Sequence, residues 1–295
     1  MNLKQLEIFY HYSDSRNVTK VAEILGLKQP TVSFHLKKLE TSLGVKLYER
    51  KREKIVLTAA GQTLNYYATE ILGLMSETNR VMKDYQSFHK GELLIGASNV
   101  PANYLLPKVL TPFVNEFPQV RVDLHIETAP KVIELIILKE IDLGIISEQG
   151  FQHEQVNVKR LVKDNLVFVM PNQGGNSNIK EVSEEKLQKE PLILHKRGST
   201  REMVDKWAEE NHFSLNIKME LTNIEAIRRM VIMGTGCSIL SKKAIENEIA
   251  REELVCFDIP SLEKNRCLSL IYRKDRPITP LLQHFITNLY TYMNE

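Results

Sequence analysis

Residues 18–40 read VTKVAEILGLKQPTVSFHLKKLE, and this stretch decides the fold of the N-terminal region. Apolar residues recur in it every three to four positions on both sides of Gly26, which predicts two short helices joined by a tight turn. Asn17 is a good N-cap for the first helix, Gly26 suits its end, and Pro30 suits the start of the second. Two helices in this arrangement are typical of a helix-turn-helix.

The second helix has one apolar face, formed by Val32, Leu36 and Leu39, and one polar and basic face. A helix of this kind fits the major groove of B-DNA, where its first turn would face the base edges. Gln29 could pair with adenine, whereas Phe34 could touch a thymine methyl group or pack against a neighbouring element. The candidate DNA-contacting residues of the two helices are Thr19, Gln29, Pro30, Thr31, Ser33, Phe34, His35, Lys37 and Lys38.

A small hairpin is expected next, because apolar residues flank a charged centre at 50–54. Arg50, Arg52 and Lys54 in its tip could straddle a phosphate backbone, which would position the domain without reading sequence. The alternative, an ordinary solvated hairpin, is weakened by the position directly after the reading helix. Residues 1–60 hold eleven Lys and Arg against six Asp and Glu, whereas the remainder holds 28 against 31. This asymmetry indicates that only the N-terminal part meets a polyanion.

The N-terminal region resembles the LysR-type transcriptional regulators. The similarity lies in AEILGLKQPTVS at 22–33, LKKLE at 36–40, LGVKLYER at 43–50 and, between the wing and the next helix, LTAAG at 57–61. The resemblance implies a winged helix-turn-helix domain at 1–58 that binds promoter DNA. Phe34 departs from the family pattern, because many members carry Arg there, so the base preference of that contact is not carried over.

A long amphipathic helix is predicted after Thr58, which can cap it. Its seam residues follow each other in steps of three and four over more than three heptads, at Leu64, Tyr67, Ile71, Leu74, Thr78, Val81, Tyr85 and Phe88. One helix cannot bury such a stripe alone. The seam and the resemblance together favour a dimerising linker helix at 59–90 over packing against the chain's own body. Two reading helices would then meet two half-sites.

Strand-like and helix-like segments alternate from Glu92 onward, which indicates an α/β domain whose sheet is largely parallel and covered by helices. The expected strands cover 93–97, 120–126, 143–146, 166–170, 192–195, 218–221 and 238–240. The length of this region suits two lobes, and the resemblance implies lobes like those of periplasmic binding proteins within an effector-binding domain at 91–295. Lobe I would hold 91–160 and 268–295, and lobe II would hold 161–267.

Polar residues follow several of these strands and precede the next helix, which is where ligands bind in open α/β sheets. Hydroxyl and amide groups at helix N-termini form sites for anions, and Arg201 would add a forked cationic donor for a carboxylate, sulfate or phosphate. The candidate effector-binding residues are Ser98, Asn99, Ser147, Ser199, Thr200, Arg201 and Asn223. Each could instead serve as an ordinary helix cap. A small anionic metabolite is therefore the expected effector.

Two other classes of protein compete with this interpretation. An enzyme could use Cys237 as a nucleophile, but that residue opens an apolar strand and no motif places a His beside it. A solute-binding component of a transporter would explain two lobes, but not the DNA-binding region. HExxH, P-loop and GxGxxG patterns are absent from the sequence, so no catalytic residue, metal or cofactor is expected.

Cysteine usage and hydropathy bear on the compartment. The three cysteines are widely spaced without a CxxC pair, as expected for reduced thiols of a cytoplasmic protein. The N-terminus lacks the pattern of a secretory signal, and no stretch approaches the roughly 18 apolar residues of a membrane span. The expected partners are double-stranded promoter DNA, the anionic effector and further copies of the chain in a homodimer or homotetramer. RNA polymerase could be another partner, and a membrane is not expected.

Overall fold

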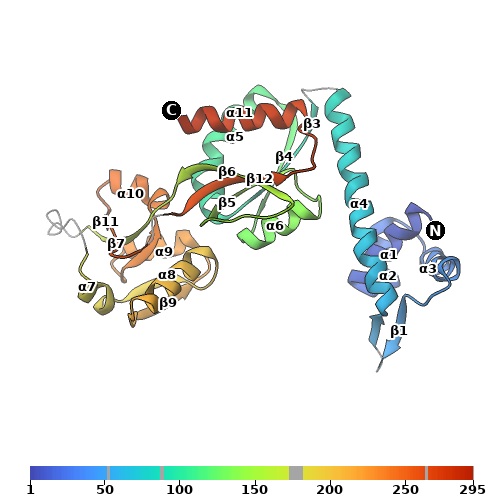
Figure 1. The fold of residues 1–295 in the computed structure, drawn as a ribbon, viewed down its shortest axis with the longest axis horizontal. Coiled ribbons are helices and arrows are strands. Elements are labelled where there is room, and N and C mark those ends of the chain that lie inside the picture. The colour runs from blue at the N-terminus through green and yellow to red at the C-terminus, as the bar shows by residue number, and fades with distance from the viewer. Residues whose placement is uncertain (52–53, 87–89, 173–181, 263–264, 295) are drawn as a thin grey trace. The chain divides into compact units, whose positions relative to one another are not determined.

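The computed structural model of the protein describes residues 1–51, 54–86, 90–172, 182–262 and 265–294. The chain forms two compact units, an N-terminal unit that holds residues 1–83 and a C-terminal unit that holds most of the remainder (Figure 1). Among the described residues, no helix combines the length and the apolar character that a membrane crossing requires.

The N-terminal unit begins with three helices, α1 Leu3–Ser15, α2 Val18–Leu25 and α3 Gln29–Leu43. Asn17 caps α2 by accepting hydrogen bonds from the backbone N–H groups of Thr19 and Lys20 at 2.9 and 3.2 Å. Gly26 and Gly44 end α2 and α3 at φ +62° and +70°, the left-handed region that favours glycine. The three helices share a core of Ile8, Phe9, Tyr12, Val21, Ala22, Val32, Leu36, Leu39 and Leu47. The predicted helix-turn-helix is confirmed.

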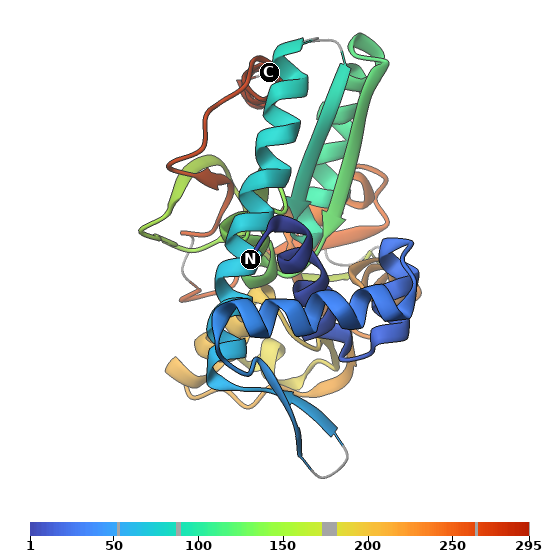
Figure 2. The same cartoon turned by 90° about the vertical axis from the view of Figure 1, so that its right-hand side faces the viewer.

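The wing is a hairpin of two antiparallel strands, β1 Tyr48–Lys51 and β2 Lys54–Leu57, which extends away from the three helices (Figure 2). Its start is fixed by the buried carboxylate of Glu40. This carboxylate accepts from the Leu47 N–H at 2.8 Å and pairs with Lys46 at 3.1 Å. The end of α3 is therefore tied to the strand that follows it.

The long helix α4 Ala59–Gln86 starts directly after β2. The Thr58 hydroxyl caps it, as predicted, by accepting from the Gly61 N–H at 3.0 Å. Gly61 is required by a close approach of two backbones, because a Cβ at this position would lie 1.9 Å from the carbonyl oxygen of Leu47. The first turn of α4 is thus held against the start of the wing.

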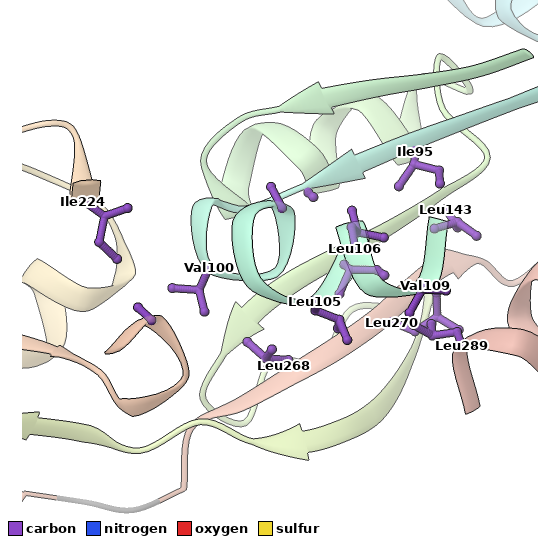
Figure 3. Packing of buried hydrophobic residues seen from close by; sticks show 14 of the residues in the cluster. Ile95, Val100, Leu105, Leu106, Val109, Leu143, Ile224, Leu268, Leu270 and Leu289 are labelled. Carbon is purple, nitrogen blue, oxygen red and sulfur yellow. The ribbon is translucent and has the colours of Figure 1, made fainter. Parts of the chain in front are cut away.

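The first lobe of the C-terminal unit is a five-stranded sheet in the order β4-β3-β5-β12-β6. Its elements are β3 Lys90–Ala97, η1 Pro101–Leu105, α5 Leu106–Glu116, β4 Gln119–Ile126, α6 Ala129–Ile137, β5 Leu143–Glu148, β6 Val156–Lys163, β12 Cys267–Arg273 and α11 Pro280–Asn294. Helices α5 and α11 cover one face of the sheet and α6 covers the other (Figure 1). Figure 3 shows the first of these faces, where Leu106 and Val109 of α5 pack with Leu143 and Leu270 of the sheet.

The second lobe contains two short sheets, β10-β7-β11 and β8-β9, which a bridge between Leu192 and Cys237 connects. Its elements are β7 Leu166–Pro171, α7 Glu184–Lys189, β8 Leu192–His195, α8 Ser199–Glu210, β9 Ile217–Leu221, α9 Ile224–Ile232, β10 Ser238–Ser241, η2 Lys242–Ile245, α10 Glu246–Ala250 and β11 Leu254–Phe257. Phe168 of β7 packs in the same cluster as α8, whereas its neighbour Val169 packs in the same cluster as α9. Helices therefore cover both faces of this lobe.

All seven strands predicted in this unit are present, but the sheets are less parallel than predicted. Strands β4, β3 and β5 are parallel, whereas β12 runs antiparallel to β5 and β6, and β7 runs antiparallel to β10 and β11. The reason is that the chain passes between the lobes twice. Strand β12 brings it back into the first sheet without the helical crossover that keeps neighbouring strands parallel.

Candidate DNA-binding and effector-binding sites

Helix α3 exposes the polar face that the sequence predicts. Most of its candidate contact residues are exposed and two are half-buried: the exposed ones are Gln29, Pro30, Ser33, Phe34, Lys37 and Lys38, and the half-buried ones are Thr31 and His35. Gln29 Nε2 donates to Thr19 Oγ1 at 2.9 Å. The carboxamide keeps its second N–H and its oxygen, which are the groups that pair with adenine. Thr19 therefore orients Gln29 and leaves these two groups available to a base.

Phe34 is the aromatic residue of this face, and its side chain is 60% exposed. The ammonium group of Lys38 lies 5.8 Å from the centre of its ring, within the range of a cation–π contact. A ring exposed to this extent is not packed into the core of the domain. Of the two alternatives for Phe34, the structure therefore favours contact with a partner.

Three residues of the wing are predicted to contact the phosphate backbone of DNA, and the structure describes two of them. Arg50 on β1 and Lys54 on β2 are both exposed, next to the turn of the hairpin. Arg52, the third, lies outside the described residues. The wing can thus present at least two cations beside the reading helix.

Helix α4 carries exposed apolar side chains at three successive seam positions. Tyr67, Ile71 and Leu74 are 57%, 39% and 52% exposed. A contiguous row of this kind on a surface helix is typical of an interface with another chain. It lies where the sequence predicts the dimer seam.

The seam is nevertheless shorter than predicted. Leu64 packs against the core of the N-terminal unit, and Val81 is buried within the chain itself. These two positions are therefore covered without a partner. Tyr85 and Phe88 lie outside the part of the chain whose side chains are described.

A cavity of about 200 Å³ lies between the two lobes of the C-terminal unit. The first residues of α6, α8 and α9 all line it. Backbone N–H groups at helix N-termini carry partial positive charge and favour anions. Five of the predicted effector-binding residues also line this cavity: Ser98, Asn99, Ser147, Ser199 and Thr200.

The start of α8 is open toward a ligand. Its N-cap is Gly198, at φ +100°, and no side chain caps its first turn. Helix α9 differs, because Asn223 caps it by accepting from the N–H groups of Glu225 at 2.8 Å and Ala226 at 3.2 Å. Asn223 is also not among the residues that line the cavity. The structure thus corrects the expectation for Asn223, which takes the ordinary capping role.

Ser98 and Ser147 lie at the ends of neighbouring strands and contact each other. The Ser98 hydroxyl accepts from the Ser147 N–H at 2.9 Å. Ser147 is 2% exposed, and its own hydroxyl has no hydrogen-bond partner among the described residues. An unpartnered buried hydroxyl costs about 1–3 kcal/mol, so the Ser147 hydroxyl is a hydrogen-bonding group that a molecule in the cavity could use.

Arg266 is the buried cation of the cavity, and it is not among the residues that the sequence predicts for the site. Its guanidinium is buried, donates to Thr200 Oγ1 at 3.1 Å and pairs with Asp164 at 3.2 Å. Arg266 directly precedes β12, where the chain returns to the first lobe. That position was the available signal, since the resemblance places a crossover at the next residue.

His195 and Arg197 were also missed, although both lie within the three residues that precede Gly198. His195 is buried, and its burial, reinforced by the nearby charge of Arg266, lowers the pKa of the imidazole to about 4. It is therefore a neutral hydrogen-bonding group at pH 7. Arg197 is exposed on the lining of the cavity, and Glu127 lies exposed on the same lining.

Arg201 does not take the place that the sequence predicts for it. Its guanidinium donates to Asp205 at 2.7 and 2.8 Å, to Glu220, and to the His195 carbonyl oxygen at 3.1 Å. It is not among the residues that line the cavity. Arg201 is paired with two carboxylates away from the cavity, whereas Arg266, which pairs with Asp164, lies on the cavity lining.

An enzyme with this sequence would depend on Cys237 as a nucleophile or on a cluster of metal ligands. Cys237 is buried, and its burial, together with the nearby charge of Glu190, raises the pKa of its thiol to about 12. Such a thiol is protonated at neutral pH and is a poor nucleophile. Within the described part of the chain, no three His, Cys, Asp or Glu side chains gather as metal ligands would.

A winged helix-turn-helix joined to a two-lobed domain with a polar cavity defines the class of ligand-responsive DNA-binding regulators. Family models agree with this assignment: residues 3–62 match the bacterial regulatory helix-turn-helix protein of the lysR family, and residues 86–293 match the LysR substrate binding domain. The chain belongs to the LysR family of transcriptional regulators. Its function is therefore regulation of transcription and not catalysis.

Several known proteins are similar over nearly the whole chain. The HTH-type transcriptional activator CmpR of Synechocystis sp. is 30% identical and covers 98% of this chain and 95% of its own length. A probable RuBisCO transcriptional regulator of Phaeodactylum tricornutum is 30% identical, with coverage of 99% and 97%. The crystal structure of full-length CbnR with its target DNA shares the fold, with a TM-score of 0.68, 22% identity and 99% of each chain covered.

Proposed function

We propose that a small anion binds in the inter-lobe cavity and controls how this regulator binds DNA. The observation that carries the proposal is the meeting of Arg266, the unpartnered Ser147 hydroxyl and the open first turn of α8 on one cavity. A fixed cation, a free hydroxyl and oriented N–H groups together recognise a carboxylate or phosphate.

The control would act through the angle between the lobes. Ser98 and Ser147 belong to the first lobe, whereas Ser199 and Thr200 belong to the second, so a bridging anion contacts both. A ligand that binds one lobe angle more tightly shifts the population toward it. In an oligomer, that shift changes the spacing of the reading helices on DNA.

For the DNA-binding unit, we assign base reading to the first turns of α3, and contacts with the DNA backbone to the wing and to further side chains of α3. Gln29, Thr31, Ser33 and Phe34 would reach base edges, with Thr19 as the residue that orients Gln29. Six further candidates would contact phosphates: His35, Lys37, Lys38, Arg50, Arg52 and Lys54. Pro30, which has no N–H to donate, would contribute by starting α3 and by van der Waals contact with the DNA.

The oligomer would form through the exposed seam of α4 around Ile71 and Leu74, as a homodimer or a homotetramer. By its likeness to the activator CmpR, the protein would activate transcription when it occupies its promoter. RNA polymerase would then be a further partner.

Thermal unfolding of the full chain with inorganic phosphate, sulfate and a panel of organic anions tests the anion site. A ligand that binds the folded state raises Tm. Ser147→Ala and Arg197→Gln should both reduce the rise in Tm. Lys196→Gln is the matched control, because Lys196 is the exposed neighbour of Arg197 and is not part of the cavity lining. Equal rises in all four proteins would overturn the proposal.

A further inference from the structure

A second cavity of about 310 Å³ adjoins the first. The two cavities share Ala129, Ser147, Ser199 and Arg266 as lining residues, so they meet at the buried cation and the unpartnered hydroxyl. The second cavity extends from this junction between α6 of the first lobe and α8 of the second.

The walls of the second cavity are mainly apolar. Ile133, Ile146 and Phe151 line it from the first lobe, and Met203 lines it from α8. Ile133, Phe151 and Met203 are only half-buried, so filling the cavity would remove further apolar surface from water. This chemistry differs from that of the first cavity, whose lining is rich in hydroxyl and charged groups.

The charged groups around the second cavity do not change this character. The Glu148 carboxylate accepts hydrogen bonds from the Phe151 N–H and the Ser269 hydroxyl, each at 2.7 Å. Lys206 pairs with Glu210 at 3.5 Å, and both side chains are largely exposed. Glu202 is exposed on α8.

We infer that the effector is a carboxylate with a compact apolar body, an inference that rests on the proposed function. The carboxylate would bind at the junction, beside Arg266 and Ser147, and the apolar body would fill the second cavity between Ile133 and Met203. Glu127 and Arg197, both exposed on the lining of the first cavity, carry opposite charges that offset each other, and Asp164 offsets the charge of Arg266. The site as a whole therefore favours a ligand of low negative charge, such as a carboxylate.

A series of straight-chain acids tests this inference by calorimetric titration of the full chain. Acetate, butanoate and hexanoate share one carboxylate and differ in apolar length. Affinity should rise by about 2- to 4-fold for each added methylene, because each one buries more apolar surface. Hexanamide, which keeps the body but lacks the charge, should bind at least about 10-fold more weakly than hexanoate.

Two matched substitutions separate the body from the carboxylate. Met203→Gln keeps the length of the side chain but replaces its apolar end. The affinity of this variant should rise less from acetate to hexanoate, and its affinity for acetate should stay unchanged. Met233→Gln is its control, since Met233 is 82% exposed and belongs to neither lining. Ser147→Ala should weaken all three acids by a similar factor.

Three outcomes would contradict the inference. In the first outcome, Ser147→Ala weakens the binding of acetate and inorganic phosphate, but affinity does not rise with the chain length of the acid. The inference of an apolar body would then be wrong, and the anion site would stand. A rise that Met203→Gln leaves intact would place the body elsewhere and overturn the inference. If Ser147→Ala alters no anion's affinity, the proposed anion site fails as well.

Discussion

Arg266 Nε lies 3.2 Å from Asp164 Oδ2, and both side chains are almost completely removed from solvent. Asp164 lies between β6 and β7, and Arg266 directly precedes β12. The pair therefore joins the two connecting segments through which the chain passes between the lobes. Burial raises the pKa of Asp164, which Arg266 and the Ser241 hydroxyl oppose. The buried pair therefore ties together the two connecting segments at the edge of the cavity that Arg266 lines.

Replacing Arg266 with Met should destabilise the C-terminal unit by about 3–5 kcal/mol, because it leaves a buried carboxylate without a cation. Unfolding in urea can be followed by the fluorescence of Trp207, the one tryptophan of the chain, which is buried in the second lobe. Adding Asp164→Asn should recover most of the loss, since the uncompensated charge is gone. A double variant as unstable as the single one would show that the ion pair is not the cause.

The pKa of His195, about 4, predicts a loss of stability in acid. Between an ordinary pKa near 6.5 and a pKa of about 4, the unfolded chain binds a proton that the folded chain excludes, so stability falls as pH decreases from 6.5 to 4. The loss should reach about 3 kcal/mol at pH 4, at about 1.4 kcal/mol for each pKa unit.

His195→Gln should remove this part of the pH dependence. The measurement is the free energy of unfolding at several pH values between 4 and 7, compared with wild type and with His212→Gln. His212 is the matched control, because it is exposed. Identical slopes in wild type and His195→Gln would contradict the burial argument.

Phe34 should read thymine methyl groups in the operator. Operator DNA can be selected from random sequence with the wild-type protein, and each thymine then replaced by uracil, which lacks the methyl group. At the contacted position, wild type should lose about 4-fold in affinity, corresponding to about 0.8 kcal/mol for one buried methyl-sized group. Phe34→Ala should lose nothing further there. If every replacement weakens both proteins equally, Phe34 does not make this contact.

Leu74→Glu should break the oligomer, because two like charges would face each other across an apolar seam. Leu74 is 52% exposed in the single chain, so the change should leave the fold of the protomer intact. Sedimentation velocity measures the result. Gln62→Glu, at an exposed position elsewhere on α4, should leave the sedimentation coefficient unchanged. A Leu74→Glu variant that sediments as wild type would remove this seam from the interface.

Local patterns account for the parts of the fold that the sequence predicts. Helices α2 and α3 follow from apolar periodicity and from caps such as Asn17 and Gly26, which act within a few residues. Strands β3 and β5 follow from short apolar runs that helices cover on both faces. Strands β6, β11 and β12 were not predicted. In β6, VNVKRLVK, polar and apolar residues follow each other without the strict alternation that indicates a half-buried strand, and the place of β12 in the first sheet depends on the path of the chain between the lobes.

The residues of the candidate site also divide into those with a local signal in the sequence and those whose role depends on the fold. Ser98, Ser147 and Thr200 could be predicted because strand ends and helix starts are visible in the sequence. Arg266 was missed: its position near the expected end of lobe II was a signal, but its pairing with the distant residues Asp164 and Thr200 depends on the fold. The error on Arg201 had a local warning, because Asp205 follows it at i+4, the spacing of a helical ion pair.

An anion in the cavity and an operator on the DNA-binding unit should each change the affinity of the protein for the other, because coupling between two binding sites is reciprocal. If an anion in the cavity changes operator affinity by some factor, the operator must change anion affinity by the same factor. The measurement is the affinity of the most stabilising anion for the full chain, free and saturated with operator. The two values should differ by about 5- to 150-fold, the usual range of allosteric coupling. In Ser147→Ala, anion binding should weaken while operator affinity without anion stays unchanged. Equal anion affinities with and without operator would contradict coupling between the cavity and the DNA-binding unit.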